Sequence, residues 1–331
     1  MRRLIGGEDL TSDEAAAFIG AVMDGEYTPA QAAGMLVALA AKGETAGEIA
    51  GAARAMRDRS LKVEHGLPMV VDVVGTGGDG ANTVNVSTMA ALVVAACGVP
   101  VAKHGNRAAS SACGSADVLE AAGLPIDIPP ETAATMLRES GFTFMFAPRY
   151  HPAMRNVGPV RRELGVRTIF NVLGPLTNPA RATHQLVGVA RESLIPVVGP
   201  VLQALGVRAG AVVHGIDGVD EVSGEASTRI YSFGEDGGRS WELDPSSLGV
   251  AVPLAQIVGD SVQACCRAFF EVLNGERTPA AKVVALNAAL VLFAIGTHST
   301  LEDALERAEA ILRSGAALRT FERAKELAIR G

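Results

Sequence analysis

Aromatic residues are scarce in this 331-residue sequence: they make up 4% of the chain and include a single tryptophan. The hydrophobic share is nevertheless 48%, so the core must be built from alanine, valine and leucine. With 20% charged residues, the composition is typical of a packed globular protein and excludes a largely disordered chain. The length suits about two domains.

An excess of basic residues is also missing, since the formal net charge is −7. Nucleic-acid binders need a basic surface to neutralise phosphates, so the charge argues against that class. Any anionic ligand must then be captured by local donors and not by the field of the whole protein.

Cysteine is rare, and its four positions form no CxxC pair. The spacing of Cys97, Cys113, Cys265 and Cys266 suits neither a zinc site nor a disulfide framework. We therefore expect reduced, mostly buried thiols.

Long apolar runs are absent as well. The longest, residues 90–97 and 283–295, fall short of the ~20 residues needed to cross a bilayer. The first 14 residues turn acidic before any apolar segment appears, which is not the pattern of a signal peptide. We expect a cytoplasmic protein that does not contact membranes.

Helix start signals dominate the first 60 residues. Thr11, Thr28 and Thr45 each stand three residues before Glu or Gln, which is the capping-box pattern. The pattern predicts a small α-helical domain over residues 1–65. Because so small a bundle buries little surface alone, we expect it to pack on other residues, including part of 160–180.

From Met69 onward, short β-rich runs alternate with helical stretches. The predicted strands are residues 69–74, 99–103, 142–146, 186–190 and 211–214, with a helix expected from His151 and another over 192–205. The alternation predicts a parallel sheet with crossover helices in a large α/β domain, residues 66–331. The pattern over residues 228–244 predicts a small antiparallel addition to the sheet. Residues 286–296 are apolar on all sides, which predicts a buried helix.

The most specific string is VGTGGDGANTVNVST, residues 74–88. Its four glycines surround Asp79 directly after a predicted strand, so backbone N–H groups can approach a ligand closely. The helix starting near Ser87 adds free N–H groups and a positive dipole end. No GK[ST] follows the glycines, so this is not a P-loop, and Asp79 inside the turn argues against a dinucleotide fingerprint. The string predicts a cradle for a phosphorylated small molecule.

Two further strings follow predicted strands and add charge. KHGNRAASS, residues 103–111, places Lys103 as a point charge beside Asn106, an orienting amide. Asp220 and Glu221 follow Gly218 and supply the oxygen ligands that Mg²⁺ prefers. Because the carboxyl ends of parallel strands form one crevice, we expect these groups to meet there.

Residues 150–168 contain four arginines, Arg155, Arg161, Arg162 and Arg167. Most are expected to form surface ion pairs, although an arginine can also clamp a carboxylate bidentately. No GxSxG or HxxxH motif occurs. These features favour a reaction driven by charge placement and positioning over covalent catalysis.

Taken together and in order, four strings carry a resemblance to a known family. They are GTGGDGANTVNVST, KHGNRAASSACGSADVLEAAG, HPAMRNVGPVRRELGVRTIFNVLGPLTNPA and HGIDGVDEVS. The sequence resembles the anthranilate phosphoribosyltransferases of tryptophan biosynthesis nearly end to end. The resemblance implies an α/β fold of the nucleoside phosphorylase/phosphoribosyltransferase type, in which helices flank a mostly parallel central sheet beside a small all-α N-terminal domain.

The resemblance also implies the reaction and the assembly. Phosphoribose would pass from 5-phosphoribosyl 1-pyrophosphate (PRPP) to the amine of anthranilate, giving N-(5-phosphoribosyl)anthranilate and pyrophosphate. Mg²⁺ would be the cofactor, and the protein would be a homodimer that contacts through the helical domain.

Site residues follow from the resemblance by position. Those implied to bind PRPP are Gly75, Gly78, Asp79, Thr83, Asn85, Val86, Ser87, Thr88, Lys103, His104, Gly105, Asn106, Arg107, Ala108, Ala109, Ser110, Ser111 and Ser115. Those implied to bind anthranilate are Gly75, Asn106, His151, Met154 and Arg161. Those implied to bind the metal are Ser87, Asp220 and Glu221. No general acid or base is assigned.

Two alternatives stay open at this point. A pyrimidine nucleoside phosphorylase-like enzyme shares the fold type, but its lysine string runs KHS where this chain has KHGNR. The second alternative is a non-catalytic relative that binds nucleic acid. The acidic net charge argues against it, and so do the intact glycine string and the intact Asp220-Glu221 string. The departures from the family pattern are Cys113 and residues 258–266.

Overall fold

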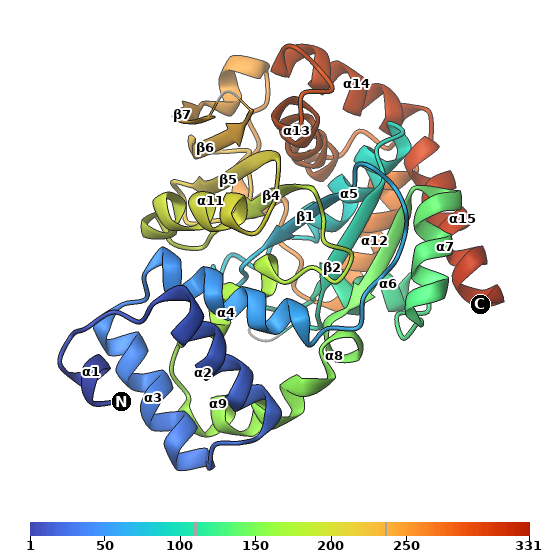
Figure 1. Cartoon of the computed structure of the whole chain (residues 1–331). Coiled ribbons are helices and arrows are strands. Elements are labelled where there is room, and N and C mark those ends of the chain that lie inside the picture. Colours follow the sequence, from blue (N-terminus) through green and yellow to red (C-terminus); the bar gives the residue numbers. More distant parts are fainter. Residues whose placement is uncertain (109–110, 236) are drawn as a thin grey trace.

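The computed structural model describes residues 1–108, 111–235 and 237–331. An α-helical part, which contains the N-terminus, lies beside a larger α/β part that ends with the C-terminal helix (Figure 1). No helix within the described residues is long and apolar enough to cross a membrane.

Four helices form the N-terminal segment: α1 (Arg2–Ile5), α2 (Ser12–Asp24), α3 (Pro29–Lys42) and α4 (Ala46–Asp58). The three predicted capping boxes are confirmed. The side chains of Thr11, Thr28 and Thr45 each accept from the N–H three residues later, and that residue's side chain accepts in return. Each box satisfies backbone donors that a helix start leaves unpaired, which is why these helices begin where the sequence predicts.

A later stretch of the chain packs on this helical part. The 3₁₀ turn η1 (Pro152–Asn156) lies against α2, and α9 (Gly158–Leu164) lies against α3. Val157, Val160 and Phe170 share one apolar cluster with the N-terminal helices. The packing agrees with the expectation that residues beyond 65 join the bundle, whereas the domain boundaries themselves stay a prediction.

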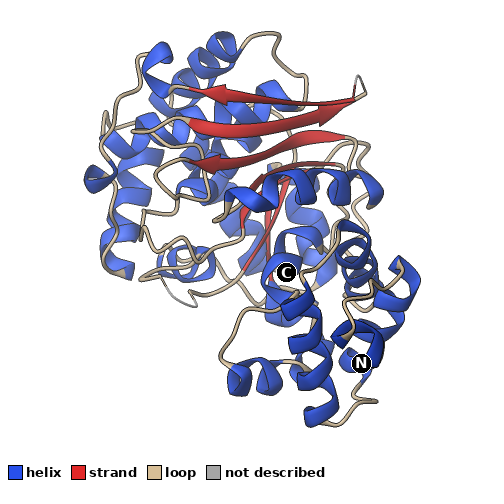
Figure 2. Cartoon of the chain, turned by 90° about the vertical axis from the view of Figure 1, so that its left-hand side faces the viewer, coloured by secondary structure: helices blue, strands red, loops and turns tan. Residues whose placement is uncertain are grey.

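Seven strands form one sheet in the order β3-β2-β1-β4-β5-β6-β7 (Figure 2). The first five in that order run parallel, and β6 and β7 are antiparallel. This confirms the mostly parallel sheet and the antiparallel addition. The bounds are β1 Val71–Gly75, β2 Val101–Gly105, β3 Phe142–Phe146, β4 His184–Gly188, β5 Ala209–Gly215, β6 Thr228–Gly234 and β7 Gly237–Leu243.

The strand positions agree with the sequence to within a small shift. Residues 142–146 match the prediction, whereas β1, β2, β4 and β5 begin two residues from their predicted starts. The prediction of a helix from His151 is wrong at its start, because no α-helix begins there. That stretch is broken into η1 and α9, because Pro152 and Pro159 cannot donate to a preceding turn. The predicted helix 192–205 begins as a 3₁₀ turn, Glu192–Leu194, before α11 (Ile195–Ala204).

The remaining helices come after β1 in the chain. They are α5 (Val86–Ala96), α6 (Ser115–Ala121), α7 (Pro130–Ser140), α8 (Ala147–Tyr150), α10 (Phe170–Leu173), α12 (Val262–Leu273), α13 (Pro279–Ala294), α14 (Leu301–Arg313) and α15 (Ala316–Arg330). Among them, α5, α7, α13 and α15 contact the strands directly. Short 3₁₀ turns occur at Gly174–Leu176, Pro245–Leu248 and Leu254–Gln256.

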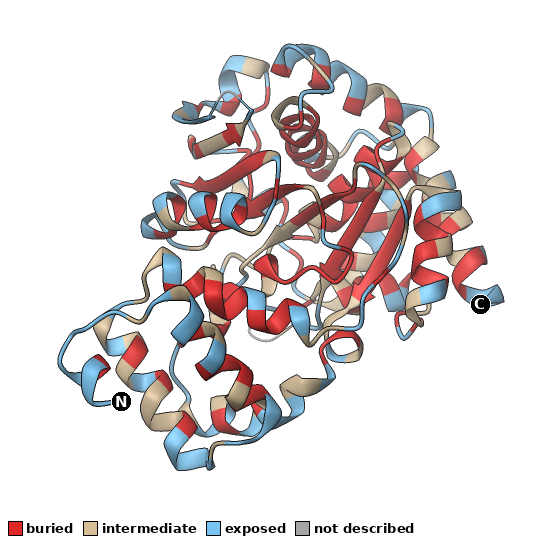
Figure 3. Ribbon diagram, viewed as in Figure 1, coloured by how far each residue is buried: buried red, intermediate tan, exposed pale blue. Residues whose placement is uncertain are grey.

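Two apolar cores lie on the two faces of the sheet. The larger core contains α5 and α13, and the predicted buried helix is confirmed because every residue from Leu286 to Leu292 in α13 is buried (Figure 3). The other core contains α11, which packs against α4 of the helical part. The second core therefore joins the sheet to the bundle.

The connection order creates a crevice between β1 and β4. From β1 the chain proceeds to β2 on one side, and from β4 to β5 on the other. Where neighbouring parallel strands diverge in this way, their carboxyl ends leave room for a ligand. Gly75 at the end of β1 pairs with Gly188 at the end of β4, so two residues without side chains stand at this point.

Candidate active site

A pocket of about 520 Å³ opens at the carboxyl ends of β1 and β2. It brings together every described residue that was predicted to bind PRPP or metal. These are Gly75, Gly78, Asp79, Thr83, Asn85, Val86, Ser87, Thr88, Lys103, His104, Gly105, Asn106, Arg107, Ala108, Ser111, Ser115, Asp220 and Glu221. Ala109 and Ser110 of the same prediction lie outside the described residues.

The glycine turn after β1 has a backbone that glycine alone adopts easily. Gly77, Gly78 and Gly80 have φ angles of +69°, +77° and +78°. The Gly77 N–H donates to Asp220 Oδ2 at 2.5 Å, and Asp79 accepts weakly from the Asp220 N–H at 3.4 Å. The turn is thus attached to the segment after β5 that carries the two predicted metal ligands.

Two strand-end glycines leave space for Asp220. A Cβ on Gly75 would lie 2.3 Å from Asp220 Oδ2, and a Cβ on Gly188 would lie 1.6 Å from the Asp220 carbonyl oxygen. Atoms cannot stand so close, so a side chain at either position would displace the segment that carries Asp220. The motifs did not reveal Gly188, because its role depends on strand pairing and not on its neighbours in the chain.

Unsatisfied polar atoms concentrate around this pocket. Buried atoms without a hydrogen-bond partner include Asn85 Oδ1, Thr88 Oγ1, His104 Nε2 and Glu221 Oε1. An unpaired buried polar atom costs about 1–3 kcal/mol, so native proteins keep few of them without a reason. Asn85 and Thr88 stand at the start of α5, where free N–H groups and the positive dipole end favour an anion.

Lys103 lies at the buried end of the pocket, at 2% exposure. Its Nζ donates to the Val73 carbonyl at 2.5 Å and to Ser87 Oγ at 3.2 Å. Burial lowers the pKa of Lys103 to about 8, while the negative charge of buried Asp72 opposes the shift. Asp72 in turn accepts from the His104 N–H and from Asn178 Nδ2, at 3.3 and 2.8 Å.

The segment after β2 folds over itself at Gly114. A Cβ there would lie 2.3 Å from the Ala108 nitrogen, so the chain needs glycine at this crossing. Asp117 Oδ2 accepts from the N–H groups of Ala108 and Gly114, both at 2.9 Å. Arg107 is occupied by ion pairs to Asp117 and Glu120. Its guanidinium therefore holds the loop in place and is not a free cation.

The carboxylates of the pocket repel one another in the absence of a cation. Burial, followed by the charge of Asp79, raises the pKa of Asp220 to about 7. Burial and the charge of Asp220 raise the pKa of Glu221 well above its usual value. Within the described residues, no group of three or more His, Cys, Asp and Glu side chains could hold a metal by itself. Two carboxylates and Ser87 nevertheless suit Mg²⁺, which takes part of its ligands from substrate oxygens.

Three residues predicted to bind anthranilate, His151, Met154 and Arg161, do not line this pocket. His151 stacks near His104, with the ring centroids 5.0 Å apart, so it lies just behind the wall. Arg161 is partly buried, with its guanidinium 5.7 Å from the centre of the Phe170 ring, and burial lowers its pKa. Gly75 and Asn106, the other two, do line it.

Arg167 and Asn171 are among the wall residues that were not predicted to bind a ligand. Arg167 lies in the segment between α9 and α10, close to Gly78 of the glycine turn, and Asn171 lies in α10. No pattern in the sequence singled them out, although Arg167 was noted among the four arginines. Cys113 also lines the pocket, as a buried free thiol.

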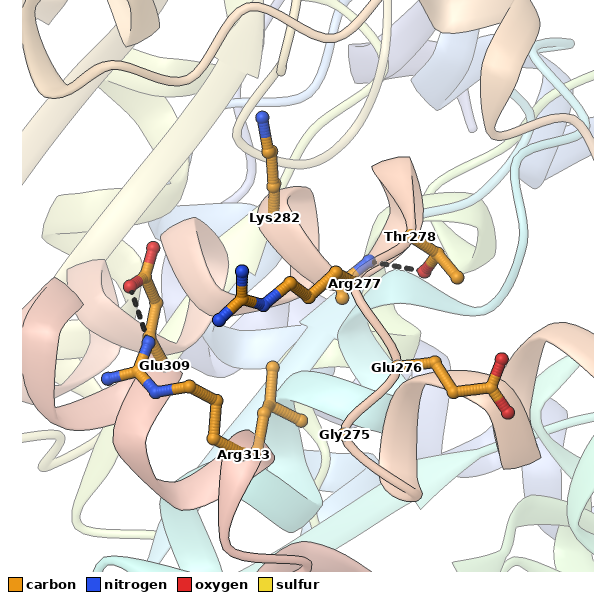
Figure 4. A pocket seen from close by; sticks show the side chains of 9 residues that line it. Gly275, Glu276, Arg277, Thr278, Lys282, Glu309 and Arg313 are labelled. Carbon is orange, nitrogen blue, oxygen red and sulfur yellow. Dashed lines mark hydrogen bonds and ion pairs between the residues drawn. The ribbon is translucent and has the colours of Figure 1, made fainter.

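A second hollow, of about 220 Å³, lies between α14 and the start of α13 (Figure 4). Its charges are mixed, and Arg313 pairs with Glu309 at 3.0 Å. None of the unpartnered buried atoms in the described chain belongs to it. It contains no residue of the predicted site.

The fold and the pocket define a class: an α/β enzyme with a helical bundle that binds a phosphorylated ligand at the carboxyl ends of its strands. Family comparison agrees. Residues 67–318 match the model described as "Glycosyl transferase family, a/b domain", and residues 1–60 match "Glycosyl transferase family, helical bundle domain".

Individual relatives define the family more narrowly. An anthranilate phosphoribosyltransferase of Thermomicrobium roseum is 49% identical over 99% of this chain and 95% of its own length. One from Symbiobacterium thermophilum is 47% identical over 98% of this chain and 96% of its own. The chain belongs to the anthranilate phosphoribosyltransferase family.

Solved structures support the same conclusion. The anthranilate phosphoribosyltransferase of Thermus thermophilus superposes with a TM-score of 0.94 at 43% identity, over 99% of this chain and 98% of that one. The Saccharomyces cerevisiae enzyme in complex with PRPP and Mg has a TM-score of 0.92 at 28% identity, over 100% and 97% of the two chains.

Proposed function

We propose that the protein transfers phosphoribose from PRPP to the amine of anthranilate, releasing pyrophosphate, as a step of tryptophan biosynthesis. One observation carries the proposal: unpartnered polar atoms of Asn85, Thr88, His104 and Glu221 surround a pocket beside a glycine turn and a buried lysine. Bound PRPP with Mg²⁺ would offer phosphate oxygens to a donor such as Thr88 Oγ1, and hydroxyl donors or the cation to acceptors such as Asn85 Oδ1 and Glu221 Oε1. Family membership selects this transfer over the phosphorylase and nucleic-acid-binding alternatives.

In this proposal the donor half of the site binds PRPP. The N–H groups of the glycine turn and of the start of α5 would hold phosphate oxygens, and Lys103 would add a fixed positive charge. Cleavage at C1 of the ribose leaves an oxocarbenium-like sugar and a highly charged pyrophosphate. Donors already in place stabilise that departing charge without reorganisation, which is the main source of rate enhancement in such reactions.

The residues at the pocket's carboxylate side fit Mg²⁺. Ser87, Asp220 and Glu221 would hold the ion together with pyrophosphate oxygens, and the unpartnered Glu221 Oε1 is an available ligand atom. When bound, the ion would neutralise charge on the leaving group. Its positive charge would also offset the burial and the mutual repulsion that raise the pKa values of Asp220 and Glu221.

The acceptor half would be formed by Asn106 and Arg161, with Gly75, His151 and Met154 nearby. Arg161 would hold the anthranilate carboxylate bidentately, while Asn106 would orient the ring so that the amine faces C1. A neutral aromatic amine is already nucleophilic, so the proposal requires no general base. Because Arg161 is not on the pocket wall, the two halves must approach one another when both substrates bind.

The test is an assay of anthranilate fluorescence with the purified protein. We expect the fluorescence to disappear only when both PRPP and Mg²⁺ are present, to persist after EDTA treatment, and to decay again when Mg²⁺ is restored. Cleavage of thymidine or uridine with phosphate, without loss of anthranilate, would favour the phosphorylase alternative. Binding of nucleic acid without either reaction would favour the non-catalytic one.

We also propose that the protein is a homodimer that contacts through its helical part. Two large apolar side chains, Ile5 at 73% exposure on α1 and Val37 at 41% on α3, support this, because exposed apolar residues on neighbouring helices suit an interface. Light scattering should give twice the mass of one chain. The double variant Ile5→Glu with Val37→Glu should give a single-chain mass while remaining folded.

Two coarser features complete the proposal. We place the boundary of the helical domain near residue 65, with residues 152–164 added to it by packing on α2 and α3. We place the enzyme in the cytoplasm, supported by four cysteines that are all free thiols, as expected in a reducing compartment.

A further inference from the structure

We propose that Arg167, whose guanidinium lies beside the glycine turn, binds a phosphate group of PRPP together with that turn, and so is an additional donor-site residue. This inference rests on the proposed function. It starts from an imbalance of charge on the pocket wall, which carries the carboxylates Asp79, Asp220 and Glu221 yet has to receive a strongly anionic ligand.

The cations of the wall are not equally available. Lys103 is buried and already donates to Val73 and Ser87. Arg107 is neutralised by Asp117 and Glu120. Arg167 is exposed and, among the residues that the structure describes, makes neither an ion pair nor a side-chain hydrogen bond. A guanidinium in that state has its whole set of N–H donors free for phosphate.

The position of Arg167 points to the glycine turn. Its Nη1 lies 3.3 Å from where a Cβ on Gly78 would stand. Gly78 has no Cβ, so the guanidinium can approach the turn directly, and any phosphate held by the N–H groups of the turn would meet it. The turn and Arg167 are therefore placed to bind the same phosphate group.

The segment that carries Arg167 is held at both ends. Gly165 ends α9 in the left-handed conformation, with φ of +61°. Beyond Arg167, the Thr168 N–H donates to Asn171 Oδ1 at 2.9 Å, and Ile169 and Phe170 are buried. An exposed arginine on an anchored segment loses little conformational freedom on binding, which suits a ligand contact.

The same segment also contacts Arg161, the residue proposed to hold anthranilate, because the guanidinium of Arg161 lies over the Phe170 ring. Arg167 belongs to the PRPP half of the site, but it lies on the chain segment that supports the anthranilate half.

The test compares Arg167→Ala, Arg167→Gln and Arg167→Lys with Arg162→Ala, a matched control that removes an exposed arginine from the same stretch. Calorimetric titration with PRPP and Mg²⁺ measures the Kd, and steady-state assays measure both KM values. We expect the Ala and Gln variants to raise the Kd and KM for PRPP about tenfold or more. The KM for anthranilate should change less than about twofold, the Lys variant should recover part of the loss, and the control should match wild type.

A Kd for PRPP within about twofold of wild type in both the Ala and Gln variants would overturn the inference. So would an equal rise in both KM values, because it would indicate general distortion of the segment. These outcomes are separate from failure of the proposed function. If the proposed function failed, the wild-type protein itself would transfer nothing to anthranilate, whatever residue stands at position 167.

Discussion

Burial shifts the pKa values of several side chains in and behind the pocket away from their ordinary values. Lys103 and His104 have lowered pKa values, and Asp220 and Glu221 have raised ones, with desolvation as the largest cause in every case. Such clusters of perturbed groups in a concave site are typical of catalytic pockets. At this scale the predictions concern what each side chain binds and which protonation state it keeps.

Arg161 should determine the use of anthranilate. Replacing it by alanine removes a bidentate partner for the carboxylate, so kcat/KM for anthranilate should fall by about a hundredfold. The Kd for PRPP should stay within about twofold of wild type. Steady-state kinetics and calorimetry measure the two effects, with Arg155→Ala, an exposed arginine, as the control. An equal loss for both substrates would contradict the assignment of Arg161 to the anthranilate carboxylate.

His151 should make the stability depend on pH. Burial lowers its pKa to about 4 in the folded protein, against an ordinary value near 6.5. As the pH falls from 6.5 towards 4, the unfolded chain takes up a proton that the folded protein does not. The free energy of unfolding should therefore fall, with this residue contributing up to about 1.4 kcal/mol per pH unit.

The measurement for His151 is urea unfolding at several pH values, for wild type and His151→Asn. The variant loses this contribution, so the difference in stability between the two proteins should shrink below pH 6.5. Parallel curves for the two proteins would mean that His151 is protonated as easily in the folded state as in the unfolded state.

At the level of elements, the ends of β1 and β4 shape the site. Both strands end in glycine, and the segment after β5 passes through the space that two side chains would fill. Parallel pairing brings Gly75 and Gly188 side by side although they are far apart in the sequence. The position of Asp220, and with it the proposed metal site, therefore depends on strand register.

Gly75→Ala should displace Asp220. The new Cβ would lie 2.3 Å from Asp220 Oδ2, so the carboxylate has to move, and a shift of about 1 Å can cost about a hundredfold in rate. The measurement is kcat as a function of Mg²⁺ concentration, where we expect lower activity and a higher Mg²⁺ requirement. Gly174→Ala, whose Cβ would meet nothing within 4 Å, is the control and should behave like wild type. Unchanged activity in Gly75→Ala would show that Asp220 is not needed where it stands.

Across the whole molecule, the helical and α/β parts are joined by buried polar contacts as well as by apolar packing. Arg57, in α4, donates from Nε to the Leu176 carbonyl at 2.7 Å and from Nη1 to the Leu205 carbonyl at 2.9 Å. Both carbonyls belong to the α/β side of the second core. The two parts of the molecule therefore share one buried arginine.

Arg57→Met should destabilise the protein by about 2–5 kcal/mol, because two buried carbonyls lose a charged donor. Arg54→Met, which removes an exposed arginine paired with Asp13, should cost less than about 1 kcal/mol. Chemical unfolding measures both. Equal small effects would mean that Arg57 does not hold the two parts together.

Local chemistry explains what could be predicted from the sequence alone. A capping box, a glycine turn after an apolar run and a strand–helix alternation each depend on residues that are neighbours in the chain. For this reason the helical N-terminus, the parallel sheet and the strings that line the pocket could be recognised without coordinates, whereas the assignment of those residues to PRPP stays a prediction. The same holds for family membership, which rests on strings of consecutive residues.

The tertiary structure decided the features that depend on residues far apart in the chain. Strand pairing brought Gly188 beside Gly75, and the path of residues 165–171 brought Arg167 over Gly78. The fold, which no local pattern records, buried Asp72 near enough to Lys103 for its charge to affect the Lys103 pKa, and left His151 behind the pocket wall. The sequence by itself determined which chemistry the chain carries, because motifs are local. Only the folded chain decided which groups share one pocket, because that depends on register and packing.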